Sequence, residues 1–427
     1  QTFSRLQSVD YYLKKSLSTL PHFLLNICVN VALKYSILYI IRNQICPNPD
    51  EENMSNIRAA ILGASKVAHL HAAAVQQAPS AELLAIWNRT HSRAVEFAER
   101  YKIKAYESIT EMIQAESIDM VTIATSHPAH AQPAIEAMHA GAHVIIDKPL
   151  ASSLQDCDAM IQTSKETGKK LGMISQRRCY PPVQRIRNAI DDGKLDVPVL
   201  GSVTMLGWRD KHYYETDAWR GTWEMEGGGV LVNQAPHQLD ILQWFLGDID
   251  EVYGLWANLN HPYIEVEDTA VAVVKFKNGA IGNILVSNSQ NPALYGKVHV
   301  FGKNGASVGV QTDGGAMFIA GMSSITEAPY NDLWTIPGEE QMREPWKDED
   351  EALFKSINPM VYFHQLQIQD FCESILTDRN PMITGEEGRK TVELFTAIYR
   401  STRDNRPIKF PLKPEYDRHD LDGRLSP

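Results

Sequence analysis

The chain from residue 57 onward alternates short apolar runs with stretches of helical spacing. The first run, IRAAIL at residues 57 to 62, is followed by VAHLHAAAVQQ, which has helical spacing, and then by a second apolar run, ELLAIW. The alternation continues through AVEFAERY, IDMVTIAT and AHAQPAIEAMHAG to HVIID, which ends at residue 147. Short apolar strands that alternate with helices are typical of a parallel sheet with crossover helices. The pattern therefore predicts a doubly wound α/β domain.

The pattern changes after residue 201. Runs rich in β-branched and aromatic residues follow, namely GSVTMLGW, DEVYGLWANL, TAVAVVKFKNGAIGNILVS and KVHVFGKNGASVGV. The Asn-Gly pairs in the last two runs favour tight turns, and FKNGAIGNI predicts a hairpin. Helical spacing returns at residues 360 to 376 and 386 to 403. We therefore expect a second, β-rich α/β domain.

The first part of the chain, residues 1 to 53, does not fit this pattern. Its residues 22 to 41, HFLLNICVNVALKYSILYII, form the longest apolar run, but Asn26, Asn30 and Lys34 interrupt it. A lysine at the centre of a membrane helix costs about 2.5–3.5 kcal/mol. We expect Met54 to be the natural start and residues 1 to 53 to be an extension outside the native fold. A helix packed on the body of the protein and a membrane anchor are the alternatives.

Composition and charge favour a small-molecule substrate. The chain is 44% hydrophobic and 22% charged, as in ordinary globular proteins. Its formal net charge of −11 would repel nucleic acid and anionic lipid, so neither is expected as a partner. The 5 cysteines are scattered, without a CxxC pair. They predict a reducing, cytoplasmic location with no disulfide framework and no metal site.

The turn after the first predicted strand is a candidate phosphate-binding site. It reads Gly63-Ala64-Ser65-Lys66-Val67 and keeps only the first glycine of the dinucleotide-binding pattern. In a doubly wound sheet, the N–H groups of this turn face a pyrophosphate, and Ser65 adds a hydroxyl donor. An ordinary strand-to-helix turn is the alternative.

The end of the second predicted strand bears on the choice of cofactor. An acidic residue there binds the ribose 2′-hydroxyl of NAD and would repel the 2′-phosphate of NADP. This chain has Asn88 and Arg89 instead, so both NAD and NADP are compatible with the site. A solvent-exposed Arg89 with no ligand is the alternative.

Three segments together resemble the Gfo/Idh/MocA family of nicotinamide-dependent sugar and cyclitol oxidoreductases. They are the strand and GAS turn, IATSHPAHAQPAIEAMHAGAHVIIDKPLA, and GGGVLVNQAPHQLDILQWFLG. The resemblance implies a Rossmann domain, here residues 54 to 175, that holds NAD or NADP. A tightly bound cofactor is one version of this expectation. It also implies a substrate-binding and oligomerisation domain, here residues 176 to 420, on a large, mostly antiparallel open sheet. Helices would cover one face of that sheet, and the other would form a homo-oligomer interface.

The resemblance also implies site residues. Asp147-Lys148-Pro149 stands where the family usually has Glu-Lys-Pro, and His237 stands on its catalytic histidine. Asn233 stands where many members carry an aspartate. The cofactor contacts implied are Gly63, Ala64, Ser65, Lys66, Val67, Asn88, Arg89, Thr125, His127, His130, Asp147 and Lys148.

Oxidation of a secondary alcohol requires a base within hydrogen-bonding reach of the hydroxyl. We expect His237 to be that base, since the usual pKa of histidine suits neutral pH. Lys148 would hold the substrate oxygen and stabilise the developing alkoxide, and Asn233 would orient His237 through hydrogen bonds. The alternatives are a core histidine, a lysine that merely ends a strand and an asparagine that caps the helix.

Aromatic and polar residues alternate in GWRDKHYYETDAWRGTWEMEGGG, which suits a sugar with apolar ring faces and hydroxyl edges. Aromatic core residues are the alternative. Arg177 and Tyr180 are further candidates, which would meet an anionic substrate or only a surface carboxylate. The complete set of predicted substrate contacts is Arg177, Tyr180, Trp208, Tyr214, Trp219, Arg220, Trp223, Asn233 and His237.

Together these features predict an NAD(P)-dependent oxidoreductase that oxidises a ring hydroxyl of a sugar or glycoside, with C3 of a glucose-like ring favoured. An inositol dehydrogenase and a sugar-nucleotide dehydrogenase are alternatives with the same fold. A non-catalytic NAD(P)-sensing regulator is the alternative from another class.

Overall fold

The computed structural model describes residues 56–314, 327–416 and 421–424. The expectations for residues 1 to 53, including the apolar run at 22 to 41, lie outside these ranges. In the described ranges, no helix is long and apolar enough to cross a membrane.

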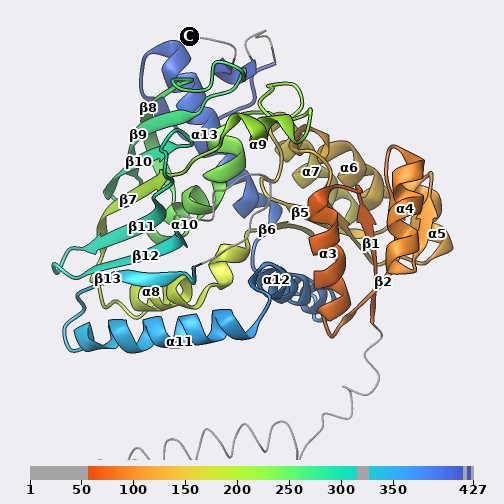
Figure 1. Cartoon of the computed structure of the whole chain (residues 1–427), viewed down its shortest axis with the longest axis horizontal. Coiled ribbons are helices and arrows are strands. Elements are labelled where there is room, and N and C mark those ends of the chain that lie inside the picture. Colours follow the sequence, from red (N-terminus) through yellow and green to blue (C-terminus); the bar gives the residue numbers. More distant parts are fainter. Residues whose placement is uncertain (1–55, 315–326, 417–420, 425–427) are drawn as a thin grey trace, which may run out of the picture. The chain divides into compact units, whose positions relative to one another are not determined.

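The first half of the fold is a six-stranded parallel sheet in the order β3-β2-β1-β4-β5-β6 (Figure 1). Its strands are β1 (Ile57–Leu62), β2 (Ala81–Trp87), β3 (Lys104–Tyr106), β4 (Met120–Ile123), β5 (His143–Asp147) and β6 (Leu171–Ile174). The crossover helices are α3 (Lys66–Gln77), α4 (His91–Tyr101), α5 (Ile109–Ala115), α6 (Ala131–Ala140) and α7 (Leu154–Thr167). Every residue of β4 and β6 is buried, as expected for strands covered on both faces. This is the predicted doubly wound Rossmann sheet.

The second half is built on an eight-stranded sheet in the order β13-β12-β11-β7-β10-β9-β8-β14. Its strands are β7 (Pro198–Leu206), β8 (Ile249–Ala257), β9 (Thr269–Phe276), β10 (Ile281–Ser287), β11 (Tyr295–Gly302), β12 (Ser307–Gly314), β13 (Tyr330–Trp334) and β14 (Ile408–Lys409). Only β7 and β10 pair in parallel, so the sheet is mostly antiparallel as expected. The predicted hairpin is confirmed by the antiparallel pairing of β9 and β10.

Helices cover one face of this second sheet. They are α8 (Pro181–Asp191), α10 (Pro236–Leu246) and α13 (Gly385–Asp404), which contact strands β7, β8, β11 and β12 (Figure 1). Alternate residues of β9 are buried beneath the helices, while Val271 and Val273 between them are 49% and 58% exposed. Leu255 and Ile281 on the neighbouring strands are also exposed. The other face of the sheet is therefore open and partly apolar.

The helix α12 (Pro359–Leu376) joins the two halves. Although it lies late in the chain, it packs on α3, and its Ile368, Phe371 and Cys372 belong to the apolar core beside β1. A side chain on Gly172 of β6 would lie 2.9 Å from the Phe371 ring. Residues after 175 thus supply part of the core of the first sheet. A domain boundary drawn at residue 175 does not predict this contribution.

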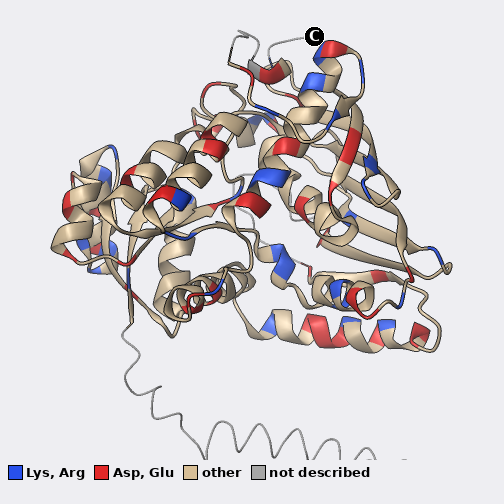
Figure 2. Ribbon diagram, turned by 180° about the vertical axis from the view of Figure 1, so that it is seen from behind, with Lys and Arg blue, Asp and Glu red and all other residues tan. Residues whose placement is uncertain are grey.

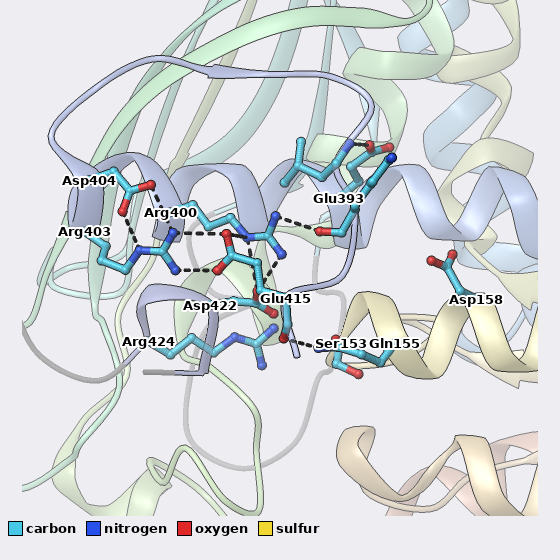
Figure 3. Close-up of polar contacts among 12 residues, drawn as sticks. Ser153, Gln155, Asp158, Glu393, Arg400, Arg403, Asp404, Glu415, Asp422 and Arg424 are labelled. Carbon is cyan, nitrogen blue, oxygen red and sulfur yellow. Dashed lines mark hydrogen bonds and ion pairs between the residues drawn. The ribbon is translucent and has the colours of Figure 1, made fainter. Parts of the chain in front are cut away.

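The C-terminal segment is fastened to α13 by ion pairs (Figure 3). Arg400 Nη2 lies 2.6 Å from Asp422 Oδ1, and Arg403 Nη1 lies 2.7 Å from Glu415 Oε2. Arg424 then donates to the main-chain carbonyl of Gly227 at 2.9 Å. The end of the described chain therefore supports the glycine turn that precedes the candidate site.

Charged residues of both signs are spread over the ribbon, and both signs occur along α11 (Arg343–Ser356), as Figure 2 shows. Interspersed charges of this kind are typical of a solvated helix face.

Candidate functional site

The turn between β1 and α3 has the backbone shape of a dinucleotide-binding turn. Gly63 has a φ of 108°, and a Cβ on it would lie 2.8 Å from the backbone of Ala124. Only glycine therefore fits, and the first N–H groups of α3 remain available for a phosphate. The prediction that the Ser65 hydroxyl is free to donate to a phosphate is wrong. Its Oγ already donates to the Ala124 carbonyl at 2.6 Å.

Two side chains that follow β2 form hydrogen bonds with this turn. The Ala64 N–H donates to Asn88 Oδ1 at 2.9 Å, and Arg93 Nη2 donates to the Ala64 carbonyl at 3.3 Å. Arg89 is exposed. The Asn88 oxygen thus supports the phosphate turn, and Arg93 is a residue near the cofactor position that sequence analysis missed. No carboxylate follows β2, as predicted, so this edge has no built-in barrier to a 2′-phosphate.

The loop after β4 is held in place by two buried histidines. His127 Nδ1 lies 3.1 Å from the Glu226 carbonyl, and burial lowers the pKa of His127 to about 3. His130 Nδ1 lies 3.1 Å from the Pro149 carbonyl and its Nε2 lies 3.3 Å from the Thr125 carbonyl. Both histidines therefore hold loops together, and contact with a cofactor by either one stays a prediction.

Asp147, at the end of β5, faces two histidines from different helices. His71 Nε2 on α3 lies 3.7 Å from Asp147 Oδ1, and one nitrogen of His364 on α12 completes a group of three potential metal ligands within 4.8 Å of one another. Burial raises the pKa of Asp147, but the His71 ring and Lys148 outweigh it and hold that pKa below its usual range. In the described ranges this is the group that could hold a metal ion, and the scattered cysteines did not point to it.

Lys148 follows Asp147 and connects the two halves of the fold. Its Nζ donates to the main-chain carbonyl of Asn233 at 2.7 Å. Burial lowers the pKa of Lys148, Asp147 opposes that change, and Arg177 adds to it. Since an ammonium has three N–H groups, the bond to Asn233 leaves two for other acceptors.

Asn233 lies in a π-helical turn, Val230–Gln234, that precedes α10. Asn233 therefore lies outside α10, the α-helix that carries His237. The alternative of a helix cap is also removed, because the cap position is Ala235. The side chain of Asn233 instead donates to Glu226 Oε1 and lies 3.4 Å from the Tyr213 hydroxyl. An orienting effect of Asn233 on His237 stays a prediction.

His237 is the second residue of α10, directly after Pro236, which lies in the first turn as predicted. The side chain is 5% exposed, and its Nδ1 bonds no described residue. Burial lowers the pKa of His237 well below its usual value, and the positive charges of Arg177 and Lys148 lower it further. The ring is therefore neutral at neutral pH, as a proton acceptor must be.

Glu226 is a site residue that sequence analysis missed. It directly precedes the glycine turn and is 2% exposed. Its Oε2 accepts the Gly221 N–H and its Oε1 accepts the Asn233 amide. Burial raises the pKa of Glu226 to about 7. The only sequence signal was its place before three glycines, which does not reveal what the carboxyl contacts.

The aromatic segment divides into two groups. Arg220 stacks over the rings of Tyr213 and Trp219, at 4.2 and 4.5 Å from the ring centroids, and Trp219 faces His127. These residues adjoin Asn233 and the loop after β4. Trp208 and Tyr214 instead cluster around His261, and Trp223 packs on the core residues Trp256 and Tyr399. Trp223 is therefore a core aromatic residue, the alternative interpretation of this segment.

Arg177 and Tyr180 lie at the base of this region. Arg177 pairs with Asp313, whose side chain is fully buried, so the alternative of a surface carboxylate is wrong. Tyr180 is 0% exposed and packs edge-to-face on Phe363. The structure gives Tyr180 a packing role, and its contact with a substrate stays a prediction. Lys66 is exposed and lies 2.9 Å from Asp217, which also pairs with Arg220, and Val67 packs beside the core of the first sheet.

A parallel sheet in the order 3-2-1-4-5-6 with a glycine turn after β1 is the fold of dinucleotide-dependent enzymes. Residues 57–175 match the oxidoreductase family with an NAD-binding Rossmann fold, GFO_IDH_MocA, and residues 183–308 match the GFO/IDH/MocA C-terminal domain. The chain therefore belongs to the Gfo/Idh/MocA family. It is an oxidoreductase with an NAD-binding Rossmann domain and a second domain on a mostly antiparallel sheet.

Two relatives of known name cover more than four fifths of the chain, and a third covers about half of it. The chain is 24% identical to the myo-inositol 2-dehydrogenase of Thermotoga maritima over 361 residues, which are 83% of this chain and 98% of that enzyme. It is 28% identical to the WlbA dehydrogenase of Bordetella pertussis, solved in complex with NADH and UDP-GlcNAcA, with a TM-score of 0.71 over 84% of this chain and 100% of that one. It is also similar to 1,5-anhydro-D-fructose reductase of Ensifer adhaerens, 26% identical over 226 residues, which are 52% of this chain and 67% of that enzyme.

The residues present fit a nicotinamide dinucleotide. The position of Gly63 excludes a side chain from the phosphate turn, and the first turn of α3 supplies N–H groups for the pyrophosphate. Lys148 is the first residue after β5, on the edge where ligands of such sheets bind. A bound nicotinamide would supply the hydride acceptor at that edge.

The end of β2 generates a testable prediction about the cofactor. We expect Asn88→Asp to weaken binding of NADPH relative to NADH by about tenfold or more, because a carboxylate there repels a 2′-phosphate. An aspartate still accepts the Ala64 N–H, so the turn is retained. Fluorescence titration with both dinucleotides measures the ratio. Gln77→Glu adds the same charge at the exposed far end of α3 and should leave the ratio unchanged; an unchanged ratio in Asn88→Asp as well would contradict the prediction.

Proposed function

We propose that the protein is a cytoplasmic NAD(P)-dependent dehydrogenase that oxidises a ring secondary hydroxyl of a sugar or glycoside, with C3 of a glucose-like ring as the favoured position. The observation that carries the proposal is the hydrogen bond between Lys148 and the turn that leads into the helix of His237. Lys148 Nζ binds the carbonyl of Asn233, one turn before His237, and the charge of Lys148 is among those that lower the pKa of His237.

In the proposed reaction, the neutral ring of His237 accepts the hydroxyl proton of the substrate. Lys148, with N–H groups left over after its bond to Asn233, donates to the same oxygen and stabilises the negative charge that develops there. The nicotinamide, when bound, accepts the hydride from the alcohol carbon. Burial of both side chains strengthens these interactions, because the local dielectric is low.

The substrate class rests on the residues beside this pair and on the relatives. Arg220, Tyr213 and Trp219 form a stacked group next to Asn233, which offers flat apolar surface beside hydrogen-bonding groups. The relatives include an inositol dehydrogenase and a reductase of an anhydrosugar. A cyclic polyol is the chemistry common to these observations.

A sugar-nucleotide dehydrogenase is the second candidate. It is favoured by the 28% identity to the WlbA dehydrogenase, whose solved complex contains UDP-GlcNAcA. An inositol dehydrogenase remains the third candidate, and a non-catalytic NAD(P)-sensing regulator is the remaining alternative. The regulator predicts cofactor binding without turnover.

We also propose that a second copy of the chain covers the open face of the eight-stranded sheet. Leu255, Val271, Val273 and Ile281 lie exposed on neighbouring strands of that face, and an apolar patch of this kind on a sheet is typical of an association surface.

Val273→Lys should convert the assembly to a monomer in sedimentation velocity, because a lysine is costly in an apolar interface. The unfolding midpoint of the monomer should change little, since Val273 is 58% exposed. Val95→Lys, an exposed position on α4, is the matched control and should keep the native assembly. A native protein that sediments as a monomer would contradict the proposal.

The catalytic assignment is tested by replacing Lys148 and His237 separately with alanine. Each change should lower kcat by about 100-fold or more, while the Kd of the dinucleotide stays within about threefold. The assay denatures the protein to identify any nucleotide that it releases, and then screens glucosides, inositols and UDP-sugars for reduction of that nucleotide.

Lys165→Ala and His139→Ala change exposed residues of the same types and should retain full turnover. Turnover that survives both Lys148→Ala and His237→Ala would remove the proposed chemistry. Dinucleotide binding without turnover of any cyclic polyol in the native protein would favour the regulator.

A further inference from the structure

Three side chains from distant parts of the chain converge at the end of β5. His71 comes from α3, Asp147 is the last residue of β5 and His364 comes from α12. Each offers one ligand atom, and these three atoms lie within 4.8 Å of one another. The centroids of the two imidazole rings are 6.0 Å apart, and the ring planes are tilted by 44°. The group therefore brings two imidazole nitrogens and a carboxylate oxygen around one point.

Each of the two histidines is held through its Nδ1 atom. His71 Nδ1 lies 2.7 Å from the hydroxyl of Thr122 on β4, and His364 Nδ1 lies 2.7 Å from the main-chain carbonyl of Met360, one turn earlier in α12. Because a carbonyl only accepts, Nδ1 of His364 carries a proton and Nε2 is the nitrogen left for a ligand. A hydrogen bond on the second ring nitrogen is the usual way in which a metal-binding histidine is oriented.

The Nε2 atom of His71 has no hydrogen-bond partner among the described residues, although His71 is 0% exposed. Asp147 Oδ1 is 3.7 Å away, beyond the range of about 2.7–3.2 Å for an N–H···O bond. Buried polar atoms are nearly always satisfied by protein, water or an ion. Two ligands of one tetrahedral zinc ion, bound at about 2.0–2.2 Å, lie about 3.3–3.5 Å apart. The distance therefore fits a shared ion better than a direct hydrogen bond.

A second buried histidine shows the contrasting arrangement. His261 is also 0% exposed and also lies beside an aspartate. Its Nδ1 is 2.7 Å from Asp268 Oδ2, and its Nε2 is 2.7 Å from the Arg209 carbonyl. Both ring nitrogens of His261 thus have partners at hydrogen-bonding distance, and neither is left for a metal ion. The group around His71 differs in this respect.

The ligand types favour one class of metal ion. Imidazole nitrogen suits Zn²⁺ and similar transition metals, whereas Mg²⁺ and Ca²⁺ are bound chiefly by oxygen. Two imidazole nitrogens and one carboxylate oxygen supply three ligands of a tetrahedral zinc site, and water completes such a site. The side chain of Asp147 is 15% exposed, so water can reach the fourth position.

We propose that His71, Asp147 and His364 bind one divalent metal ion of the zinc type, with water as the fourth ligand. The ion joins α3 and the end of β5 to α12, the helix that packs on α3 from late in the chain (Figure 1). Its role is structural, because it fixes α12 against the first sheet. The proposal is independent of the dehydrogenase activity, since metal binding is measured without substrate or dinucleotide.

The primary experiment measures zinc uptake by the full chain. The protein is stripped with a chelator and dialysed to equilibrium against Zn²⁺ or Mg²⁺, and the bound metal is measured by elemental mass spectrometry. We expect one tightly bound Zn²⁺ per chain, with a Kd of about 1 μM or below, and no Mg²⁺ at the same concentration. X-ray absorption should show nitrogen and oxygen neighbours at about 2.0–2.2 Å, outer-shell scattering from imidazole and no sulfur.

Two variants remove one ligand each. His71→Gln and His364→Gln should each weaken zinc binding by about 100-fold or more. His261→Gln is the matched control, because it removes an equally buried histidine from beside an aspartate, and it should keep the native Kd. Zn²⁺ at about 100 times its Kd should raise the unfolding midpoint of the native and control proteins by about 3–5 °C and leave that of the ligand variants unchanged.

A measurement on the native protein covers the case in which neither ligand variant folds. Crystals grown with Zn²⁺ should show an anomalous scattering peak at the zinc edge between His71, Asp147 and His364. In solution, Zn²⁺ should slow amide hydrogen exchange in α12, because the ion fixes that helix.

A native protein that takes up no zinc, or a zinc Kd that is the same in the native protein and both ligand variants, would overturn the proposal. Density without anomalous signal at this position would identify a buried water and overturn it as well, and sulfur neighbours would assign the zinc to cysteines. Turnover by a protein that binds no zinc retains the dehydrogenase and rejects only the metal site. Zinc bound at these three residues in a protein without turnover does the reverse.

Discussion

The hydrogen bond from Lys148 Nζ to the carbonyl of Asn233 is the contact on which the site depends. It joins the end of the parallel sheet to the π-helical turn before α10, the helix that carries His237. Glu267 stabilises the turn, because its carboxyl accepts the N–H groups of Gly229 and Leu231. The position of the amine thus depends on the second domain as much as on its own strand.

Burial makes the charges of this region interdependent. The pKa of Lys148 and that of His237 are lowered, and the pKa of Glu226 is raised, in each case chiefly by burial. In such surroundings a proton moved on one group changes the others by more than it would in water. The protonation of Lys148, His237 and Glu226 is therefore coupled.

Sequence reasoning succeeded where the signal is local. The parallel strands, the hairpin at Asn278-Gly279 and the need for glycine at position 63 each depend on a few neighbouring residues. It failed where the partner is remote. The hydroxyl of Ser65 is taken by a carbonyl after β4, and α12 completes the core beside α3 from the far end of the chain.

For the candidate site, too, residue identities were predictable from the sequence but remote contacts were not. Lys148 and His237 were singled out by motif, but the contact between their two turns is made by a main-chain atom of Asn233, which no residue type reveals. Glu226 carried no signal of its own, because its importance lies in what it faces. The π-helical turn places Asn233 outside α10, and the residue types around Asn233 do not reveal a turn of this kind.

The central claim is that one alcohol oxygen meets both Lys148 and His237. The most direct measurement is a crystal structure of the protein with its dinucleotide and an unreactive cyclic polyol. The account predicts a ring nitrogen of His237 and Nζ of Lys148 both within about 2.6–3.2 Å of the same hydroxyl oxygen, with its carbon facing the nicotinamide. A polyol whose hydroxyl meets neither side chain, or only one of them, would contradict it.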